Sequence, residues 1–352
     1  MVVLENVGID ISMADFQVCF MVLLEGQNRK IKGTRKFKNT PEGFKAFRQW
    51  VEKKHLADVP LRMTMEATGV YYEGLAYDLY HHDYELSVVL ANKAKAYFKS
   101  LNLKTKTDKI DAKSLAQFGL ERKLNNWEPA SKQMYSLKKT CRERVRLLEE
   151  KNLIFNQLHA EQHTQSPDQS AIKRMNERLE LMDKQLKAVQ GEIEQKVQAD
   201  QLLNERVQNI VQVKGLGIVT VASVIAETNG FALFRNRAQL VSFAGYDVAQ
   251  RESGSSIKGK TRISKKGNRY IRRALFFPAI SVVKYHEEFK QIYLRIFDRT
   301  KIKMKGYVAV QRKLLVLIYT LFKKNEAYDP NAYKNNVQKV CRQDSIDPAY
   351  AG

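Results

Sequence analysis

The sequence predicts an α/β domain, then a long helical arm, then a mainly α-helical domain. Three observations indicate this order. Strand-like apolar runs fill residues 1–40, strand and helix patterns alternate up to about residue 128, and Glu, Lys, Gln, Arg and Leu dominate from residue 131 to about residue 207. With 352 residues, the chain is long enough for two or more parts with cores of their own.

The first part follows a recognisable order of elements. The predicted strands cover residues 8–12, 16–24, 30–37, 61–66 and 86–90. A helix with Thr40 as its cap and Pro41 at its first position separates the third and fourth strands, and a second helix passes through Leu75 and Leu79. Three strands, a helix, and then alternating strands and helices is the order of a ribonuclease-H-like domain.

Four acidic residues are candidate metal ligands. Asp10 and Glu66 each interrupt an apolar predicted strand, where a carboxylate is costly to bury unless it is paired or bound to a metal. Asp108 and Asp111 stand three apart and therefore share one face of a predicted helix. Alone, that pair is more simply a solvated acidic pair at a helix N-terminus. Together with the two strand acids, it predicts a site for Mg²⁺ or Mn²⁺.

Composition indicates the class of partner. Lys and Arg number 60 against 38 Asp and Glu, a formal net charge of +22. This excess favours nucleic acid over a membrane because no lipidation signal or amphipathic anchor accompanies it. Three scattered cysteines predict a reducing compartment without disulfides. With no signal peptide and no membrane-spanning run, we expect a cytoplasmic protein.

A basic stretch with aromatic residues lies just before the acidic pair. Tyr97 and Phe98 stand among cations in residues 91–107, a mixture that suits a nucleic-acid backbone and stacked bases. A solvated helix whose aromatic side chains face the core explains the pattern equally well. The position beside the acids favours substrate contact. The candidate cations are Lys93, Lys95, Lys99, Lys104 and Lys106.

The arm carries a heptad-like apolar seam. Its members recur at alternating steps of four and three, and residues 164–169 interrupt the helix before them. Two helices that fold back as a hairpin, or helices that pair between subunits, both explain the pattern. The seam consists of Met175, Leu179, Met182, Leu186, Val189 and Ile193.

The last part is predicted to be helical around a glycine turn. Gly215 and Gly217 separate two predicted helices, the sequence form of a helix-hairpin-helix, although a plain tight turn would look the same. Residues 309–322 predict a core helix, and the chain becomes polar after Tyr328.

Residues 244–273 combine small and hydroxyl residues with many cations. Such a stretch suits a serine that attacks a phosphodiester, but a Ser/Gly loop alone is more often a flexible linker. The candidate cations are Lys258, Lys260, Arg262, Lys265, Lys266, Arg269 and Arg272.

Residues 8–12, 65–69 and 107–112, in that order, resemble the DEDD motifs of the insertion-sequence "one-ten" family of transposases. A second resemblance joins Gly245, Ser253-Gly254 and residues 266–272 to that family's Ser-Gly and Lys/Arg-Gly-Asn blocks. Tyr246 and Val248 replace the usual Leu and Pro, and Glu252 stands where a Ser is common. We expect Ser253 to be the nucleophile, with Ser255 and Ser256 as alternatives.

This resemblance implies a division and a mechanism. Residues 1–128 would form a RuvC-like domain, 129–207 a coiled-coil arm, 208–328 a transposase domain with the catalytic serine, and 329–352 a polar tail. Asp10, Glu66, Asp108 and Asp111 would hold Mg²⁺ or Mn²⁺, and Ser253 would link covalently to double-stranded DNA during strand exchange. It also implies a structured guide RNA from the element and a homo-oligomer, either a dimer or a tetramer.

Two other functions suit the same residues. One is a metal-dependent nuclease like a Holliday-junction resolvase, which forms no covalent intermediate. The other is a non-catalytic basic nucleic-acid-binding protein whose acids are structural. Metal dependence distinguishes the second alternative from the recombinase, and a covalent protein–DNA adduct distinguishes the first.

Overall fold

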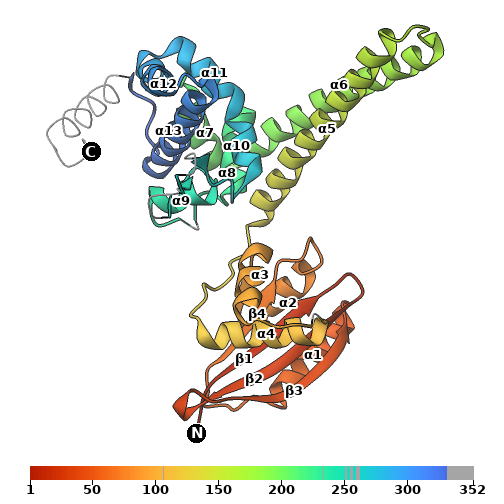
Figure 1. Ribbon diagram of the computed structural model, residues 1–352, viewed down its shortest axis with the longest axis vertical. Coiled ribbons are helices and arrows are strands. Elements are labelled where there is room, and N and C mark those ends of the chain that lie inside the picture. Colours follow the sequence, from red (N-terminus) through yellow and green to blue (C-terminus); the bar gives the residue numbers. More distant parts are fainter. Residues whose placement is uncertain (106, 233, 250–251, 254–256, 259–261, 331–352) are drawn as a thin grey trace, which may run out of the picture. The chain divides into compact units, whose positions relative to one another are not determined.

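The computed structural model describes residues 1–330 except 106, 233, 250–251, 254–256 and 259–261, and only the backbone of residues 252–253 and 257–258. Two compact units make up the chain, Met1–Pro129 and Ala130–Gly352 (Figure 1). The finer division at residues 207 and 328 stays a prediction.

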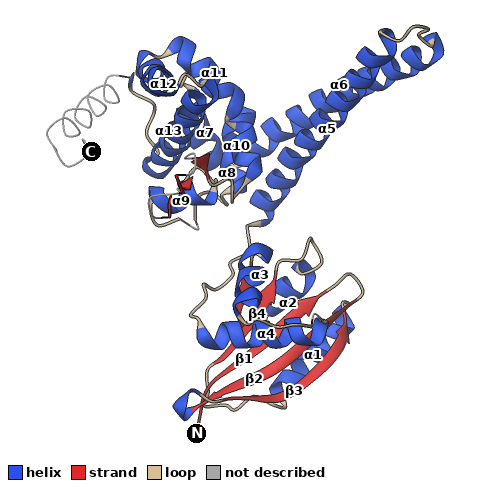
Figure 2. Ribbon diagram, viewed as in Figure 1, coloured by secondary structure: helices blue, strands red, loops and turns tan. Residues whose placement is uncertain are grey.

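The N-terminal unit contains a mixed five-stranded sheet with the strand order β3-β2-β1-β4-β5 (Figure 2). The first three strands pair antiparallel, whereas β4 pairs parallel with β1 and β5 pairs parallel with β4. The α/β prediction is therefore confirmed. The strands are β1 (Val2–Ile11), β2 (Asp15–Leu24), β3 (Arg29–Lys38), β4 (Leu61–Glu66) and β5 (Glu85–Val89).

Helices cover both faces of this sheet. They are α1 (Pro41–Glu52), α2 (Glu73–His81), α3 (Ala91–Ser100) and α4 (Asp108–Glu121). Phe44 and Phe47 of α1 join Ile9 in one core cluster, as the apolar spacing of α1 predicted. Ala112 and Ala116 of α4 pack with β2 in a separate cluster. Because successive side chains of a strand point to opposite faces, β1 contributes to both layers.

The arm is a hairpin of two long helices, α5 (Lys132–Gln162) and α6 (Gln169–Gln198), which lie side by side (Figure 1). Val189 and Ile193 of the predicted seam are buried, as are Ile154 and Leu158 of α5. This seam is thus covered within the chain. Of the two explanations that the sequence left open, the hairpin describes this structure.

The rest of the second unit is mostly helical. Its helices are α7 (Gln201–Val211), α8 (Ile218–Glu227), α9 (Arg237–Phe243), α10 (Arg269–Ala274), α11 (Phe276–Tyr285), α12 (Glu287–Thr300) and α13 (Lys303–Lys324). Leu137 of α5 and Ile193 of α6 share one core cluster with Leu314 of α13, so the base of the arm packs with these helices. None of the helices in the described ranges is both long and apolar enough to cross a bilayer.

The predicted glycine turn joins α7 to α8. Gly215 has a φ of 107°, a backbone conformation that residues with a Cβ rarely adopt. A Cβ at this position would also lie 3.1 Å from the side chains of Ser281 and Val282 on α11. Packing against α11 therefore explains this glycine without any ligand.

Candidate active site

The two strand acids lie next to each other at one end of the sheet. The parallel register pairs Ile9 of β1 with Met65 of β4, so the following residues, Asp10 and Glu66, are neighbours at the carboxyl ends of their strands. Both are partly buried. Partners in a parallel register point to the same face, so the two carboxylates share one face of the sheet.

Helix α4 covers that face and brings the other two acids to the same end. A Cβ at Gly8 would overlap the α4 backbone at Ala112 and Ala116, and the amide of Asn6 donates to the Ala116 carbonyl at 2.7 Å. Along β1, Asn6 contacts Ala116, and Gly8 also lies against Ala112, which is nearer the N-terminus of α4. Asp10, two residues further on the same face, therefore lies towards the start of α4. Asp108 and Asp111 lie in that first turn, which Thr107 caps.

A lysine that the sequence analysis missed lies in the same region. Lys36 of β3 stands opposite Gln17 of β2, which in turn stands opposite Asp10. Its ammonium lies 2.8 Å from an oxygen of Asp15. The pKa of Lys36 is raised, first by the hydrogen bond to Asp15, with the negative charges of Asp15 and Asp108 acting in the same direction. The acidic end of the sheet therefore contains its own cation.

The acids fit Mg²⁺ or Mn²⁺ by donor type and backbone placement. Carboxylate oxygens are the ligands that these cations prefer, and the backbone carries four carboxylates to one end of the unit. Within the residues that the structure describes, however, no group of three or more His, Cys, Asp and Glu side chains is arranged to hold a metal ion. The backbone thus brings the four acids to one end of the sheet, but their side chains do not form a ligand group in this structure.

The basic stretch before α4 is divided between core and surface. The Tyr97 ring stacks on Phe118 with centroids 4.2 Å apart, and its hydroxyl donates to Glu121 at 2.7 Å. Phe98 packs against the core cluster to which Phe118 belongs. These aromatics face the core, as the alternative explanation held. Lys93, Lys95, Lys99 and Lys104 are exposed, whereas Lys106 lies outside the described residues.

The candidate nucleophile lies in a β-hairpin, which the sequence did not predict. Short ladders pair β6 (Val248–Ala249) with β9 (Arg262–Ile263) and β7 (Glu252–Ser253) with β8 (Ile257–Lys258). Ser253 pairs with Ile257, so it is the last residue of its strand. Ser255, Ser256 and Lys260 lie outside the described residues, and the side chains of Ser253 and Lys258 are not described.

The base of this hairpin is tightly held by residues that resemble the transposase family's motifs, namely Gly245 and residues 266–272. Gly245 has a φ of 73°, and a Cβ at Gly267 would overlap the Phe243 carbonyl. Arg272 is partly buried and donates to the Ala244 carbonyl at 2.7 Å. We predicted a nucleic-acid contact for Arg272, and in this structure it holds the hairpin base.

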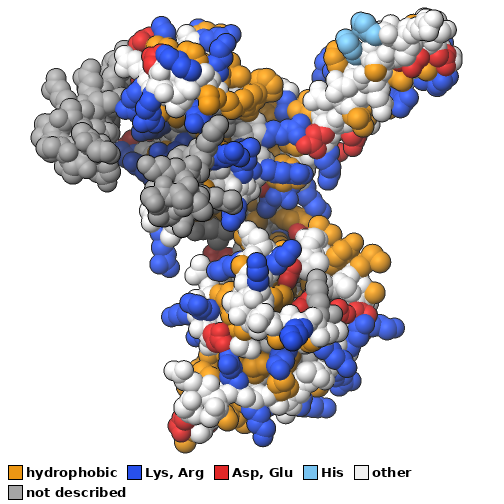
Figure 3. Space-filling view, in the orientation of Figure 1, with side chains coloured by type: hydrophobic (Ala, Val, Ile, Leu, Met, Phe, Trp, Pro, Cys, Tyr) orange, Lys and Arg blue, Asp and Glu red, His pale blue; other side chains and the backbone are white. Residues whose placement is uncertain are grey.

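The remaining predicted cations of this region reach the surface. Arg262, Lys265, Lys266 and Arg269 are exposed. The guanidinium of Arg269 lies over the Tyr270 ring, and Arg142 of α5 lies over the same ring at 4.4 Å from its centroid. On the face shown in Figure 3, Lys and Arg side chains are spread over several elements of each unit rather than gathered on one.

A buried carboxylate, also missed in the sequence, links the arm to the start of α10. Glu227, at the end of α8, accepts two hydrogen bonds from Arg142 at 2.6 and 2.9 Å. It also accepts one from the amide of Asn268 at 2.7 Å. The side-chain oxygen of Asn268 caps α10 by accepting from the backbone N–H groups of Tyr270 and Ile271. The one sequence feature that could have indicated this carboxylate is an acid directly after the apolar residues 218–226.

We expect Asn268→Ala to destabilise the chain more than Asn236→Ala. Both residues cap a helix, and each cap contributes about 1 kcal/mol. Only Asn268 also donates to buried Glu227, a bond to a charged group that adds about 1.5 kcal/mol or more. Urea unfolding followed by circular dichroism measures the difference. Equal losses in the two variants would show that the Glu227 contact adds nothing.

Comparisons with known proteins match both units. Residues 7–161 match the DEDD family model described as "Transposase", and residues 207–294 match the model described as "Transposase IS116/IS110/IS902 family". The first match contains all four candidate acids, and the second contains Ser253.

Relatives of named function align with different shares of the chain. The "Pilin gene-inverting protein" of Moraxella bovis is 28% identical over 93% of this chain and 98% of its own length. The "Transposase for insertion sequence element IS1111A" of Coxiella burnetii is 28% identical over 39% of this chain and 38% of its own. A Ppx/GppA structure from Aquifex aeolicus covers 92% of both chains, but its TM-score of 0.21 establishes no shared fold.

Proposed function

Because this chain belongs to the IS110 family of transposases, we propose that it cuts and exchanges DNA strands with the four acids of its first unit and a serine of its second. The observation that carries the proposal is the gathering of Asp10, Glu66, Asp108 and Asp111 at one end of a sheet, inside a family match. The strand order, with three antiparallel strands followed by parallel ones, supports a RuvC-like N-terminal domain.

The four acids would hold the divalent cations. When bound, Mg²⁺ or Mn²⁺ would neutralise charge that develops on the scissile phosphate. The chain's own contribution is to carry the carboxylates on two strand ends and one helix start, which the close packing of α4 on β1 fixes. Lys36, whose ammonium lies 2.8 Å from Asp15, adds a positive charge at the same end of the sheet.

Ser253 would supply the nucleophile. Its oxygen forms a bond to phosphorus while the bond from phosphorus to one deoxyribose oxygen breaks, the serine loses its proton, and the leaving oxygen gains one. The phosphoserine link preserves the phosphodiester energy, so attack by another deoxyribose hydroxyl can rejoin the strands. The clamped hairpin base supports this role because Arg272 holds Ala244, at the start of the segment that leads to Ser253.

The arm would contribute to assembly. Its seam is covered within the hairpin, but Leu153, Phe155 and Leu181 are each more than half exposed. A dimer or tetramer that forms through the arm would cover these apolar side chains. The proposal of a guide RNA rests on the family resemblance and on the net charge of +22, which suits binding of two nucleic acids.

A cleavage assay with and without Mg²⁺, on DNA that traps adducts, tests this function. The proposal expects metal-dependent cleavage together with a covalent protein–DNA species. Cleavage without the covalent species would favour the resolvase-like nuclease. Binding without cleavage would favour the non-catalytic protein.

We expect the affinity for duplex DNA to fall linearly with salt on logarithmic axes, with a slope of about −0.9 per neutralised phosphate. Lys99→Ala should reduce the magnitude of this slope by about 0.9 if Lys99 contacts one phosphate. Lys45→Ala, at another exposed lysine, on α1, is the control. Fluorescence anisotropy over a salt series measures both. An affinity that does not change with salt contradicts the expectation.

A further inference from the structure

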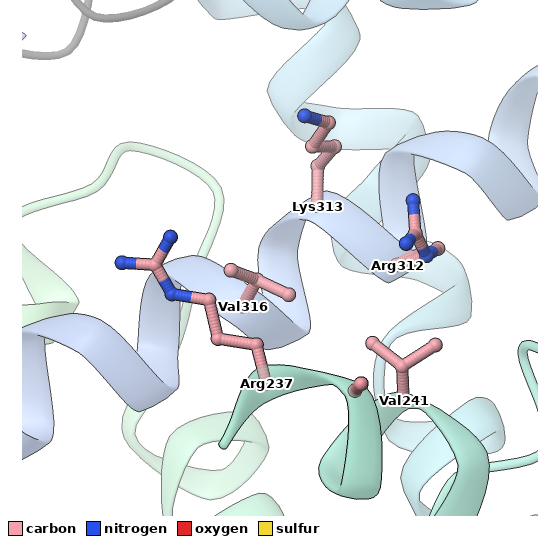
Figure 4. Close-up of a pocket in the computed structure, with 6 residues that line it drawn as sticks. Arg237, Val241, Arg312, Lys313 and Val316 are labelled. Atoms are coloured by element: carbon pink, nitrogen blue, oxygen red, sulfur yellow. The ribbon is translucent and has the colours of Figure 1, made fainter.

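A cavity of about 320 Å³ lies between α9 and α13 in the second unit. Its lining residues are Arg237, Ala238, Val241, Arg312, Lys313 and Val316. Figure 4 shows Val241 and Val316 between the two helices, with the three cationic side chains around them. The cavity therefore combines an apolar floor with a cationic rim.

Its size limits the ligand to one small group. Pockets for small ligands measure roughly 300–1,000 Å³, so this cavity lies at the lower end of that range. A ring with one charged substituent fits such a volume, whereas a segment of duplex does not.

The positive charge of the lining indicates that the ligand of this cavity is an anion. The described lining contains two arginines and one lysine but no acidic residue. Arginine binds phosphate oxygens with paired donors, and lysine binds them as a point charge. An inorganic ion would gain nothing from the apolar lining, but the flat face of a base would bury apolar surface on exposed Ala238 and partly buried Val316. A nucleotide satisfies both halves of the lining.

The cavity is connected to the hairpin that carries Ser253. The Tyr246 hydroxyl, at the start of that hairpin, donates to Gln311 at 2.9 Å, and Gln311 directly precedes Arg312. The Tyr246 amide also donates to the carbonyl of Val241 at 3.0 Å. Both walls of the cavity are thus bonded to the same buried tyrosine.

We propose that this cavity binds one unpaired nucleotide of the nucleic acid that lies at the serine hairpin. The proposal rests on the proposed function, because a nucleic acid must first reach the hairpin. The base of this nucleotide lies on Ala238 and Val316, and its phosphate lies at Arg237 and Arg312. Because a duplex offers no extruded base, the cavity distinguishes unpaired from paired positions.

Oligonucleotide duplexes with and without one bulged nucleotide test this, in DNA and in RNA, with the full chain and fluorescence anisotropy. The double variant Arg237→Ala/Arg312→Ala should lose about tenfold in affinity for a bulged probe. It should lose about twofold or less for the fully paired duplex. Ala238→Trp, which fills the cavity and keeps the cations, should show the same selective loss. Lys323→Ala, which removes an exposed cation of α13 outside the lining, is the control.

The outcomes separate the cavity from the wider function. Selective loss on bulged DNA alone or bulged RNA alone identifies the strand that supplies the nucleotide. Equal losses on bulged and paired probes, or none, overturn the cavity proposal while nucleic-acid binding stands. Failure of the unaltered chain to bind any probe contradicts the proposed function itself.

Discussion

Asp10→Asn should reduce strand cleavage by more than about a hundredfold while the fold stays intact. Changes to the partners of metal ligands already cost roughly 10–100-fold, and a lost ligand should cost at least as much. Asp10 is only partly buried at the end of β1, so an amide of nearly the same shape is tolerated there. Cleavage of supercoiled DNA at saturating Mg²⁺ measures the effect, and anisotropy confirms that DNA binding persists.

Asp15→Asn is the matched control for this experiment. Asp15 is a partly buried acid at the start of β2, and it pairs with Lys36 rather than belonging to the four proposed ligands. We expect its variant to keep cleavage within a few-fold of the unaltered chain. Wild-type cleavage by Asp10→Asn, or an equal loss in both variants, would contradict the placement of the metal site.

Ser253→Ala should abolish both recombination and the covalent adduct, because the hydroxyl is the atom that joins phosphorus. DNA binding should stay within about twofold, since one neutral hydroxyl contributes little to phosphate affinity. Ser264→Ala is the control in the same hairpin. The Ser264 hydroxyl donates to Asp247 at 2.9 Å, so this variant should still form the adduct. If Ser253→Ala still forms an adduct, Ser255 and Ser256 become the candidates.

Mixed oligomers show whether subunits share a site. We expect Ser253→Ala and Asp10→Asn subunits, each inactive alone, to recover activity when mixed, because one subunit supplies the acids and the other the serine. A site completed only on assembly would prevent an isolated subunit from cutting DNA. No recovery, with mixing confirmed by two affinity tags, would place the whole site in one chain.

The N-terminal fold followed from sequence because its signals are local. Apolar alternation and the cap at Thr40 gave the strands and α1. Asp10 and Glu66 are neighbours because the two strands that carry them pair in parallel register. The position of Lys36 depends on a register across three strands, and no local pattern reports that.

The C-terminal site was less predictable for a different reason. The hairpin that carries Ser253 has two-residue ladders and no apolar alternation, so its sequence is typical of a linker. The bond between Arg142 and Glu227 joins residues 85 positions apart. Tyr97 had two equal explanations until its stacking on Phe118 showed that it faces the core.

The most direct test of the proposed roles of Ser253 and the four acids is mass spectrometry of the protein–DNA adduct. The full chain is incubated with Mg²⁺ and a DNA substrate that traps cleaved strands, and is then digested for peptide mapping. The account predicts that the DNA remnant is attached to the peptide containing Ser253, and that Asp10→Asn or chelation of Mg²⁺ removes it. Efficient cleavage with no modified peptide, or attachment at a residue outside the hairpin, would contradict the account.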